Sequence, residues 1–71
     1  MIEKEKLLCI AKDILGTEKI EMDTDMKDVG KWDSLAHVML IAAVVENFGV
    51  FISVDDAAKI RCLGDFLKYG K

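Results

Sequence analysis

The feature that most constrains the fold is an apolar run from Leu35 to Val45 that is interrupted only by His37. Asp33 stands two residues before the run and can cap a helix, and Gly49 follows soon after it and can end one. These signals predict a helix from Ser34 to about Phe48, whose length of about 22 Å is too short to cross a bilayer. In a chain of 71 residues with no proline, such a helix leaves room for a single domain, residues 1–71, with a small core.

The residues before this helix predict another amphipathic helix and then a long loop. A helix is expected over about residues 3–15, ended by Gly16, because apolar residues recur there with helical spacing, at Leu7, Leu8, Ala11, Ile14 and Leu15. Residues 16–33 show no sustained period, so we expect an ordered loop with one short turn at 25–29. Its apolar anchors are Ile20, Met22, Met26 and Val29.

The residues after the apolar run predict two shorter helices. Asp55 or Asp56 can start a short helix that reaches Ile60, and residues 65–69 form a last helix before Gly70. Segment 50–54 has high β propensity, but a lone strand would have no partner, so we expect an extended connection there. The predicted fold class is all-α: a small bundle of three main helices plus one short helix, with the long loop between the first two.

The helix predicted over residues 34–48 is apolar on both sides. At about 100° per residue, one face carries Leu40, Ile41, Val44 and Phe48, and the other carries Leu35, Val38, Met39, Ala42 and Val45. A bundle this small can bury one such face, so we expect the second face to be exposed and to meet a partner. In the alternative, the long loop covers it through Met22 and Met26.

The charge distribution narrows the class of partner. The net charge is −3, and it comes from residues 17–33, which hold six acidic and three basic residues. Without a basic patch we expect no nucleic-acid partner. The acidic segment favours either a basic protein that docks near Ser34 or a solvated loop. Asp23, Asp25 and Asp28 lack the glycine and glutamate spacing of a calcium loop, so no metal site is expected.

Six charged residues among the first fifteen leave no apolar export segment there, so we expect a cytoplasmic monomer without membrane contact. The two cysteines, Cys9 and Cys62, are too few for a disulfide framework or a metal motif. We expect both to be buried thiols, with a reactive role as the alternative.

The start of the apolar helix predicts a site of covalent attachment. Ser34 would lie in the first turn, where unpaired N–H groups and the helix dipole favour an anion, so a phosphate would suit it. Asp33, Ser34 and His37 lack the oxyanion turn and the second acid of a hydrolase, and no catalysis is expected. His37 is expected at the surface or as a partner contact.

The motif Asp33–Leu35, followed by a long apolar helix that ends in Glu46–Gly49, resembles the acyl carrier protein family over nearly the whole chain. Phe48 and Ile52, the segment 55–60, and the later Leu63 and Phe66 extend the resemblance. It implies that a phosphopantetheinyl transferase moves 4′-phosphopantetheine from coenzyme A to Ser34, and that the thiol of this group then holds acyl groups as thioesters. The implied role is a non-catalytic carrier for acyl-loading and acyl-processing enzymes of fatty acid, polyketide or related biosynthesis.

Two alternatives stay open at this point. One is a peptidyl or aminoacyl carrier of the same fold. The other is an unmodified helical protein-interaction module that binds a partner helix through its exposed apolar face.

The resemblance and the helix faces together assign two further sets of residues. The expected partner surface comprises Trp32, Leu35, Val38, Met39, Ala42, Val45 and Glu46. Members that serve fatty acid synthesis tend to carry several acids there, whereas Glu46 is the only one here. The residues Gly30, Lys31 and Trp32 before the motif also differ from the commoner lead-in of the family and are more similar to those of specialised stand-alone carriers. Trp32 has an alternative role as an apolar staple at the helix start. The expected acyl pocket comprises Leu40, Val44, Phe48, Ile52, Ala57, Ile60 and Phe66; Phe66 replaces a usually small residue, which favours a short or polar cargo.

Overall fold

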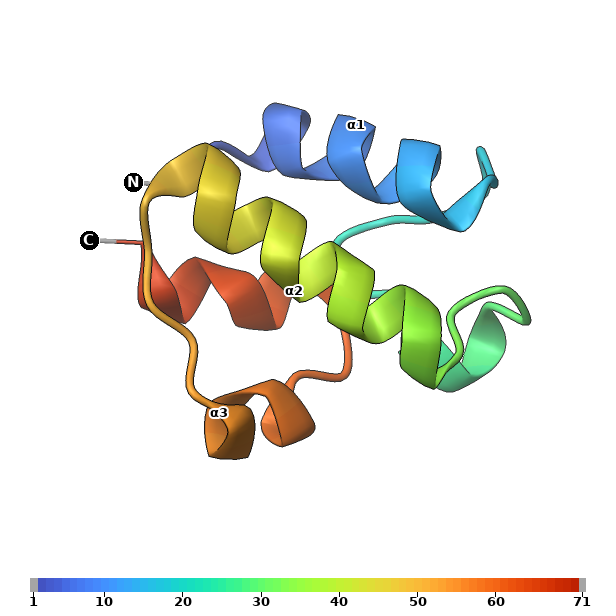
Figure 1. Cartoon of the computed structure of the whole chain (residues 1–71). Coiled ribbons are helices and arrows are strands. Elements are labelled where there is room, and N and C mark those ends of the chain that lie inside the picture. The colour runs from blue at the N-terminus through green and yellow to red at the C-terminus, as the bar shows by residue number, and fades with distance from the viewer. Residues whose placement is uncertain (1, 71) are drawn as a thin grey trace.

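Helix α2 (Ser34–Phe48) has the bounds that the apolar run predicts, and it crosses the whole molecule in the computed structural model, which describes residues 2–70 (Figure 1). It begins where the Asp33 carboxylate accepts the Ala36 N–H at 2.9 Å. It ends at Gly49, which has a left-handed φ of 63° and donates its N–H to the Val45 carbonyl at 3.0 Å. An L residue with a side chain rarely adopts that conformation, so glycine fixes the end of the helix.

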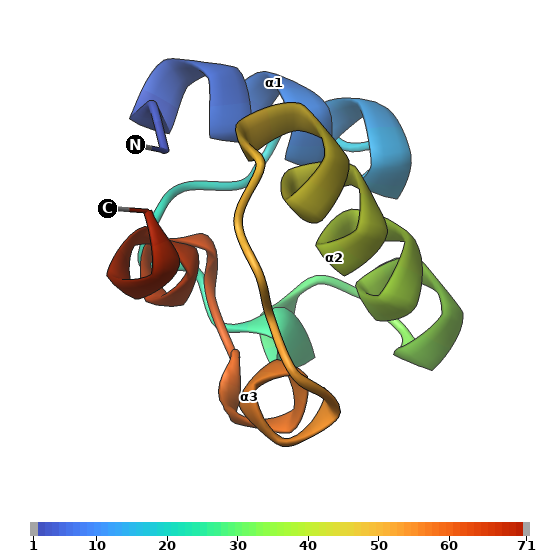
Figure 2. The same cartoon turned by 60° about the vertical axis from the view of Figure 1, so that its left-hand side comes forward.

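Helix α1 (Lys4–Leu15) lies along α2 in both orientations (Figures 1 and 2). Leu7, Ala11 and Leu15 form its buried stripe, and Gly16 ends it with a φ of 63°. The predicted helix over residues 3–15 is therefore confirmed. Cys9 lies on the opposite side of α1 and is exposed, so the prediction of two buried thiols is wrong for this residue; Cys62 is half-buried.

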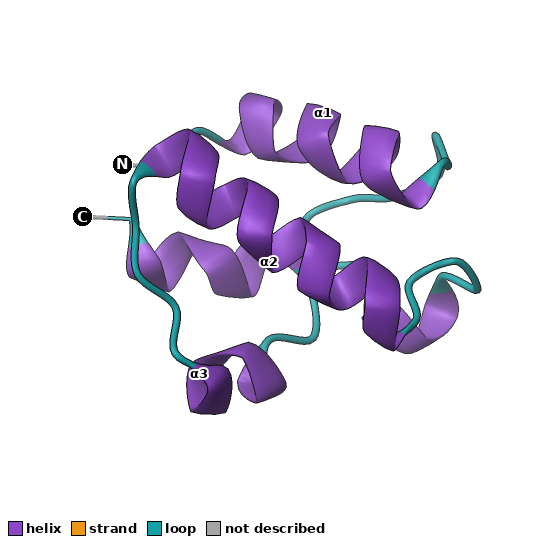
Figure 3. Ribbon diagram, in the orientation of Figure 1, coloured by secondary structure: helices purple, strands orange, loops and turns teal. Residues whose placement is uncertain are grey.

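The long loop between α1 and α2 is ordered by the anchors that the sequence predicts. Ile20 and Val29 are buried, and Met22 and Met26 are half-buried against the core. The predicted short turn is a 3-10 turn, η1 (Met26–Asp28), visible as a short purple coil in Figure 3. Its cap is the carboxylate of Asp25, which accepts the Lys27 N–H at 3.0 Å.

Two short helices complete the fold. Helix α3 (Val54–Lys59) begins one residue earlier than the sequence predicts, because the Ser53 hydroxyl caps it by accepting the Asp56 N–H at 3.1 Å. The last element is a 3-10 helix, η2 (Leu63–Tyr69), which starts two residues earlier than predicted. There the Asp65 carboxylate accepts the N–H groups of Arg61 and Cys62 at 2.9 and 3.3 Å, which orders the preceding turn.

The connection from α2 to α3 is extended, and residues 2–70 contain no strand (Figure 3). The predicted all-α class with three main helices and one short helix is confirmed. None of the helices in this range is long and apolar enough to span a membrane. Ile2 and Gly70, the first and last residues that the structure describes, lie side by side far from the start of α2: a Cβ at Gly70 would lie 2.6 Å from the Ile2 nitrogen (Figure 1).

The core lies between α1, α2 and η2, with Phe66 as the largest fully buried side chain. Leu7, Leu40 and Val44 belong to the same core cluster and have no measurable exposure. Leu63 is also completely buried, and Leu15 and Ile60 are at most 2 % exposed. One face of α2 is therefore buried in the core. The other face is not needed for packing within the bundle.

Candidate attachment site at the start of α2

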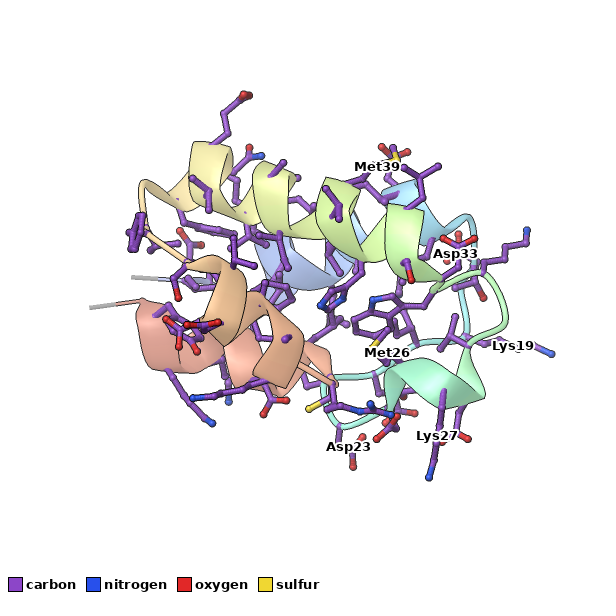
Figure 4. All side chains as sticks on the ribbon, turned by 60° about the horizontal axis from the view of Figure 1, so that its bottom comes forward. Lys19, Asp23, Met26, Lys27, Asp33 and Met39 are labelled. Carbon is purple, nitrogen blue, oxygen red and sulfur yellow. The ribbon has the colours of Figure 1, made fainter. Side chains whose placement is uncertain are left out.

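Ser34 is exposed, and its hydroxyl lies in the first turn of α2. The Ala36 N–H is bonded to the Asp33 carboxylate and the His37 N–H to the Asp33 carbonyl at 2.9 Å. The N–H groups of Ser34 and Leu35 have no hydrogen-bond partner within residues 2–70. Figure 4 shows Asp33 at the solvent-exposed end of the helix. The turn therefore presents a hydroxyl beside two unpaired donors and the positive end of a fifteen-residue helix.

The chain has one other serine, Ser53, in a different environment. Its hydroxyl accepts the Asp56 N–H and so serves as the cap of α3. Asp55 and Asp56 occupy the first turn of that helix, where their negative charge opposes an approaching anion. Of the two hydroxyls, only that of Ser34 combines exposure with an anion-favouring turn.

Trp32 was expected on the partner surface, and this expectation is wrong. Its indole is only 3 % exposed and packs in the core, because a ring of this size gains more from burial than any other side chain in the loop. The indole N–H donates to Nδ1 of His37 at 2.9 Å. Trp32 therefore takes the alternative role, a staple that fixes how the chain approaches α2.

His37 was expected at the surface or against a partner, and it is instead half-buried and bonded through both ring nitrogens. Nδ1 accepts the Trp32 indole N–H, and Nε2 lies 2.9 Å from the Ala57 carbonyl. Both lone positions of the ring are thus occupied by partners other than Ser34. His37 has no position from which to act as a base on the Ser34 hydroxyl.

The second apolar face of α2 is exposed beside Ser34, as expected. Leu35 is 71 % exposed, Val38 63 % and Met39 50 %, and Ala42 and Glu46 are also exposed while Val45 is half-buried. Met39 points away from the bundle in Figure 4, whereas Met26 points into it. The alternative in which the loop covers this face is therefore wrong.

Two further exposed apolar side chains were not predicted from the sequence. Phe51, in the connection from α2 to α3, is 81 % exposed, and Val54, the first residue of α3, is 87 % exposed. The alternation in this segment could have revealed Phe51, because Val50 and Ile52 on either side of it are half-buried. Exposed apolar side chains thus occur both at the start of α2, at Leu35, Val38 and Met39, and after its end, at Phe51 and Val54.

The seven residues expected to form an acyl pocket divide into two groups. Leu40, Val44, Ile60 and Phe66 are packed in the core, and Phe48 is half-buried at the far end of α2 with the Lys6 ammonium 5.6 Å from its ring centre. Ile52 and Ala57 line an open groove of about 230 Å³ between α2 and α3. This α2–α3 groove is completed by Val38, Ile41, Ser53 and Val54. The structure thus shows a shallow apolar groove near Ser34 rather than a cavity among all seven residues.

The perturbed ionisable groups lie away from Ser34. The Lys27 N–H holds the pKa of Asp25 below its ordinary value of 3.8, and the Arg61 side chain, 3.3 Å away, adds to this effect. The Arg61 N–H lowers the pKa of Asp65 in the same way. Partial burial, followed by the Asp56 carboxylate, raises the pKa of Tyr69 above 10.0. These groups cap and join the turns; within the described part of the chain no cluster of three metal-ligating side chains occurs.

A comparison with protein families adds one finding to this geometry. The family model described as "phosphopantetheine attachment site" matches residues 5–69, from the first turn of α1 to the end of η2. The match includes both serines and every helix of the fold.

Proposed function

Because the chain belongs to the phosphopantetheine attachment site family of carrier proteins, we propose that Ser34 is the residue that carries the 4′-phosphopantetheine. Members of this family hold the group covalently on a serine. The chain offers two serines, and the hydroxyl of Ser53 is engaged in capping a helix whose first turn is acidic. The single observation that carries the assignment is the exposed Ser34 hydroxyl in a turn with unpaired N–H donors and no acidic residue after the cap Asp33.

The start of α2 fits a phosphodiester for electrostatic reasons. The group keeps a negative charge after attachment, and the unpaired N–H groups of Ser34 and Leu35 together with the helix dipole stabilise such a charge. When bound, the group supplies a thiol that holds a cargo as a thioester. The chain itself contributes the attachment hydroxyl, the capped turn and the exposed surface, while partner enzymes load and process the cargo.

Intact-mass spectrometry after incubation with a phosphopantetheinyl transferase and coenzyme A tests the assignment. One adduct of the mass of phosphopantetheine is expected on the wild type and on Ser53→Ala, and none on Ser34→Ala. Both variants change a serine to alanine, so they are matched. An adduct on Ser34→Ala, or an unmodified wild type with a transferase that modifies another carrier in the same tube, would contradict the proposal.

For the cargo, we propose an acyl group that is short or polar, in fatty acid, polyketide or related biosynthesis. The fully buried Phe66 ring occupies the space between the helices that a long chain would need, and the α2–α3 groove is open and shallow. A peptidyl or aminoacyl cargo is the alternative of the same fold, and the groove is compatible with its smaller side chains as well.

The length of the cargo can be tested by melting temperature. Loading the holo protein with a butyryl or a dodecanoyl thioester should raise the melting temperature little in both cases, because no interior space receives the longer chain. Phe66→Leu removes part of the ring at a modest cost in stability, and there the dodecanoyl chain should stabilise more than the butyryl chain. A strong stabilisation of the wild type by dodecanoyl would contradict the proposal.

For the partners, we propose that transferase and loading enzymes dock on the predicted surface without Trp32. This surface comprises the half-buried Val45 and the exposed residues Leu35, Val38, Met39, Ala42 and Glu46. The exposure of Leu35, Val38 and Met39 favours apolar contacts over the acidic contacts typical of fatty acid synthesis. The same observation favours the second candidate, an unmodified interaction module. The two differ in one result: a module keeps its partner affinity in Ser34→Ala, whereas a carrier loses all cargo transfer.

A further inference from the structure

His37 connects two elements that the fold otherwise joins loosely. The Trp32 indole can only donate and the Ala57 carbonyl can only accept, so Nδ1 of His37 must be the acceptor and Nε2–H the donor. The ring is therefore neutral and in the Nε2–H tautomer. Both bonds are 2.9 Å long, and the two rings lie 6.0 Å apart, centre to centre, at 34°. We refer to Trp32, His37 and Ala57 as the hydrogen-bond chain.

One end of this chain fixes the turn that holds Ser34. Trp32 stands directly before the capping residue Asp33, and its ring is buried. His37 lies one helical turn after Ser34, so the bond between the two side chains closes a bridge across the attachment turn. Because Trp32 before the turn is buried and is bonded to His37 after it, the turn between them is restricted in its movement.

The other end of the hydrogen-bond chain, at Ala57, holds α3. This helix has six residues and no fully buried residue, and a helix of that length is unstable without tertiary contacts. Its own last turn bonds the Ala57 carbonyl only through the Ile60 N–H at 3.3 Å, which leaves room for a second donor. His37 Nε2 lies 2.9 Å from that carbonyl, so this bond ties α3 directly to α2.

The hydrogen-bond chain also lies beside the α2–α3 groove. Ala57 contributes to the α3 side of the groove, and Val38, the next residue after His37, contributes to the α2 side. Along α2, His37 stands between Ser34 and the groove residue Ile41. The distance between the two sides of the groove at this point is thus set by a bond that starts one turn from Ser34.

We propose that Trp32 and His37 are positioning residues, which use the hydrogen-bond chain to fix the α3 side of the groove relative to Ser34. The hydrogen-bond chain keeps the groove at a defined position relative to the cargo attached to Ser34. This inference rests on the proposed function only for what the groove receives; the bonds themselves are properties of the unmodified protein.

The first test uses the unmodified chain and nitrogen NMR of the single histidine. The expected spectrum shows a protonated Nε2 and an unprotonated Nδ1 at neutral pH, with the Trp32 indole N–H slow to exchange. A predominant Nδ1–H tautomer, or an indole N–H that exchanges as in a free tryptophan, would overturn the proposal.

The second test separates the two bonds with a pair of amide side chains. In His37→Gln the amide N–H can occupy the place of Nε2 and bond Ala57, whereas in His37→Asn the amide oxygen can occupy the place of Nδ1 and bond Trp32. Amide exchange in α3 should stay as in the wild type for His37→Gln. It should rise in His37→Asn by about two- to twelvefold, the factor that corresponds to one neutral hydrogen bond.

Exchange in α1 serves as the internal control, because a general loss of stability would raise it too. Equal exchange of α3 in the two variants, or a rise in α1 that matches α3, would overturn the positioning role. His37→Ala adds the loss of both bonds if it folds, and the amide pair is informative without it.

The third test reads the groove in the loaded carrier. Attachment of a butyryl thioester to the holo protein should shift the methyl resonances of Val38 and Ala57 in the wild type and in His37→Gln, and these shifts should be lost in His37→Asn. Shifts that persist in His37→Asn would overturn the link to the groove. If Ser34 is never modified, the proposed function fails while the first two tests still stand, so the two failures are distinguishable.

Discussion

Helices α2 and α3 both begin next to a serine, but only one of these serines keeps its hydroxyl available. At α3 the serine is itself the cap, and Ser53 gives its oxygen to the Asp56 N–H. At α2 the cap is Asp33, one residue earlier, so that Ser34 follows the cap and its hydroxyl is exposed. A shift of one position relative to the cap thus separates a serine that caps a helix from one whose hydroxyl stays exposed.

The charges near the two helix starts strengthen the same difference. The first turn of α3 contains Asp55 and Asp56, whereas the first turn of α2 contains no acidic residue after its cap. α2 also has fifteen residues against six in α3, so its N–H groups belong to a longer row of aligned dipoles. Both serines lie at a helix start, so the neighbouring residue types, and not the helix start itself, make their environments different.

Moving the serine by one position should have the largest effect on modification at the start of α2. The double variant Asp33→Ser with Ser34→Ala places a serine at the cap of α2, where its hydroxyl accepts the Ala36 N–H as Ser53 does at α3. We expect no adduct by intact mass after incubation with transferase and coenzyme A, although the chain keeps a serine in nearly the same place.

The single variant Asp33→Ser is the control for the missing carboxylate. It keeps Ser34, and its new serine preserves the cap, so modification of Ser34 should persist. If the double variant is modified as fast as the control, the position relative to the cap has no importance and the comparison fails.

The two serines should also differ, by a smaller effect, in their contribution to the free energy of unfolding. Ser53→Ala and Asp33→Ala each remove a cap and should lower the free energy of unfolding by about 1 kcal/mol, whereas Ser34→Ala should change it by less than about 0.5 kcal/mol. For a domain of this size, 1 kcal/mol corresponds to a fall of about 4–8 °C in melting temperature. Urea titration of the three variants measures the difference, and equal losses for the two serines would contradict it.

The smallest expected effect is a pH dependence at a third capped turn. Asp65 accepts the N–H groups of Arg61 and Cys62, and its pKa lies below the ordinary value of 3.8. A carboxylate whose pKa is lower in the folded state contributes stability above its unfolded pKa and loses it as the pH falls through the folded one. Stability should therefore decline below about pH 3.8, and Asp65→Asn should flatten that decline. An unchanged acid profile in Asp65→Asn would show that the other carboxylates dominate.

The sequence predicts most of the fold because its signals are local. Gly16 and Gly49 end their helices in the left-handed conformation, and the period of apolar residues finds the buried side of α1. The cap of α2 and the position of Ser34 in its first turn could be predicted for the same reason, since Asp33 and Ser34 are adjacent. The start of α3 differs from the prediction by one residue because its cap is Ser53.

The errors arose where the outcome depends on residues far apart in the chain. The environment of His37 is set by Ala57, twenty residues later, and the burial of Trp32 by the closure of the whole core around it. Several elements together also decide which of the expected pocket residues are packed in the core, as Leu40, Val44, Ile60 and Phe66 are, and which line the groove, as Ile52 and Ala57 do. Cys9 is a different error: at about 200° from both Leu7 and Ala11 around the helix axis, its exposure could have been predicted from the period alone.

Trp32 gives the protein an intrinsic optical reporter at the site of interest. It is the only tryptophan of the chain, and it lies two residues from Ser34, with its ring shielded from solvent and bonded to an imidazole. All fluorescence excited at the red edge of the protein absorption therefore originates next to the turn that holds Ser34. A change in its emission during transferase or loading reactions reports events at that turn in real time, without a label and in the unmodified sequence.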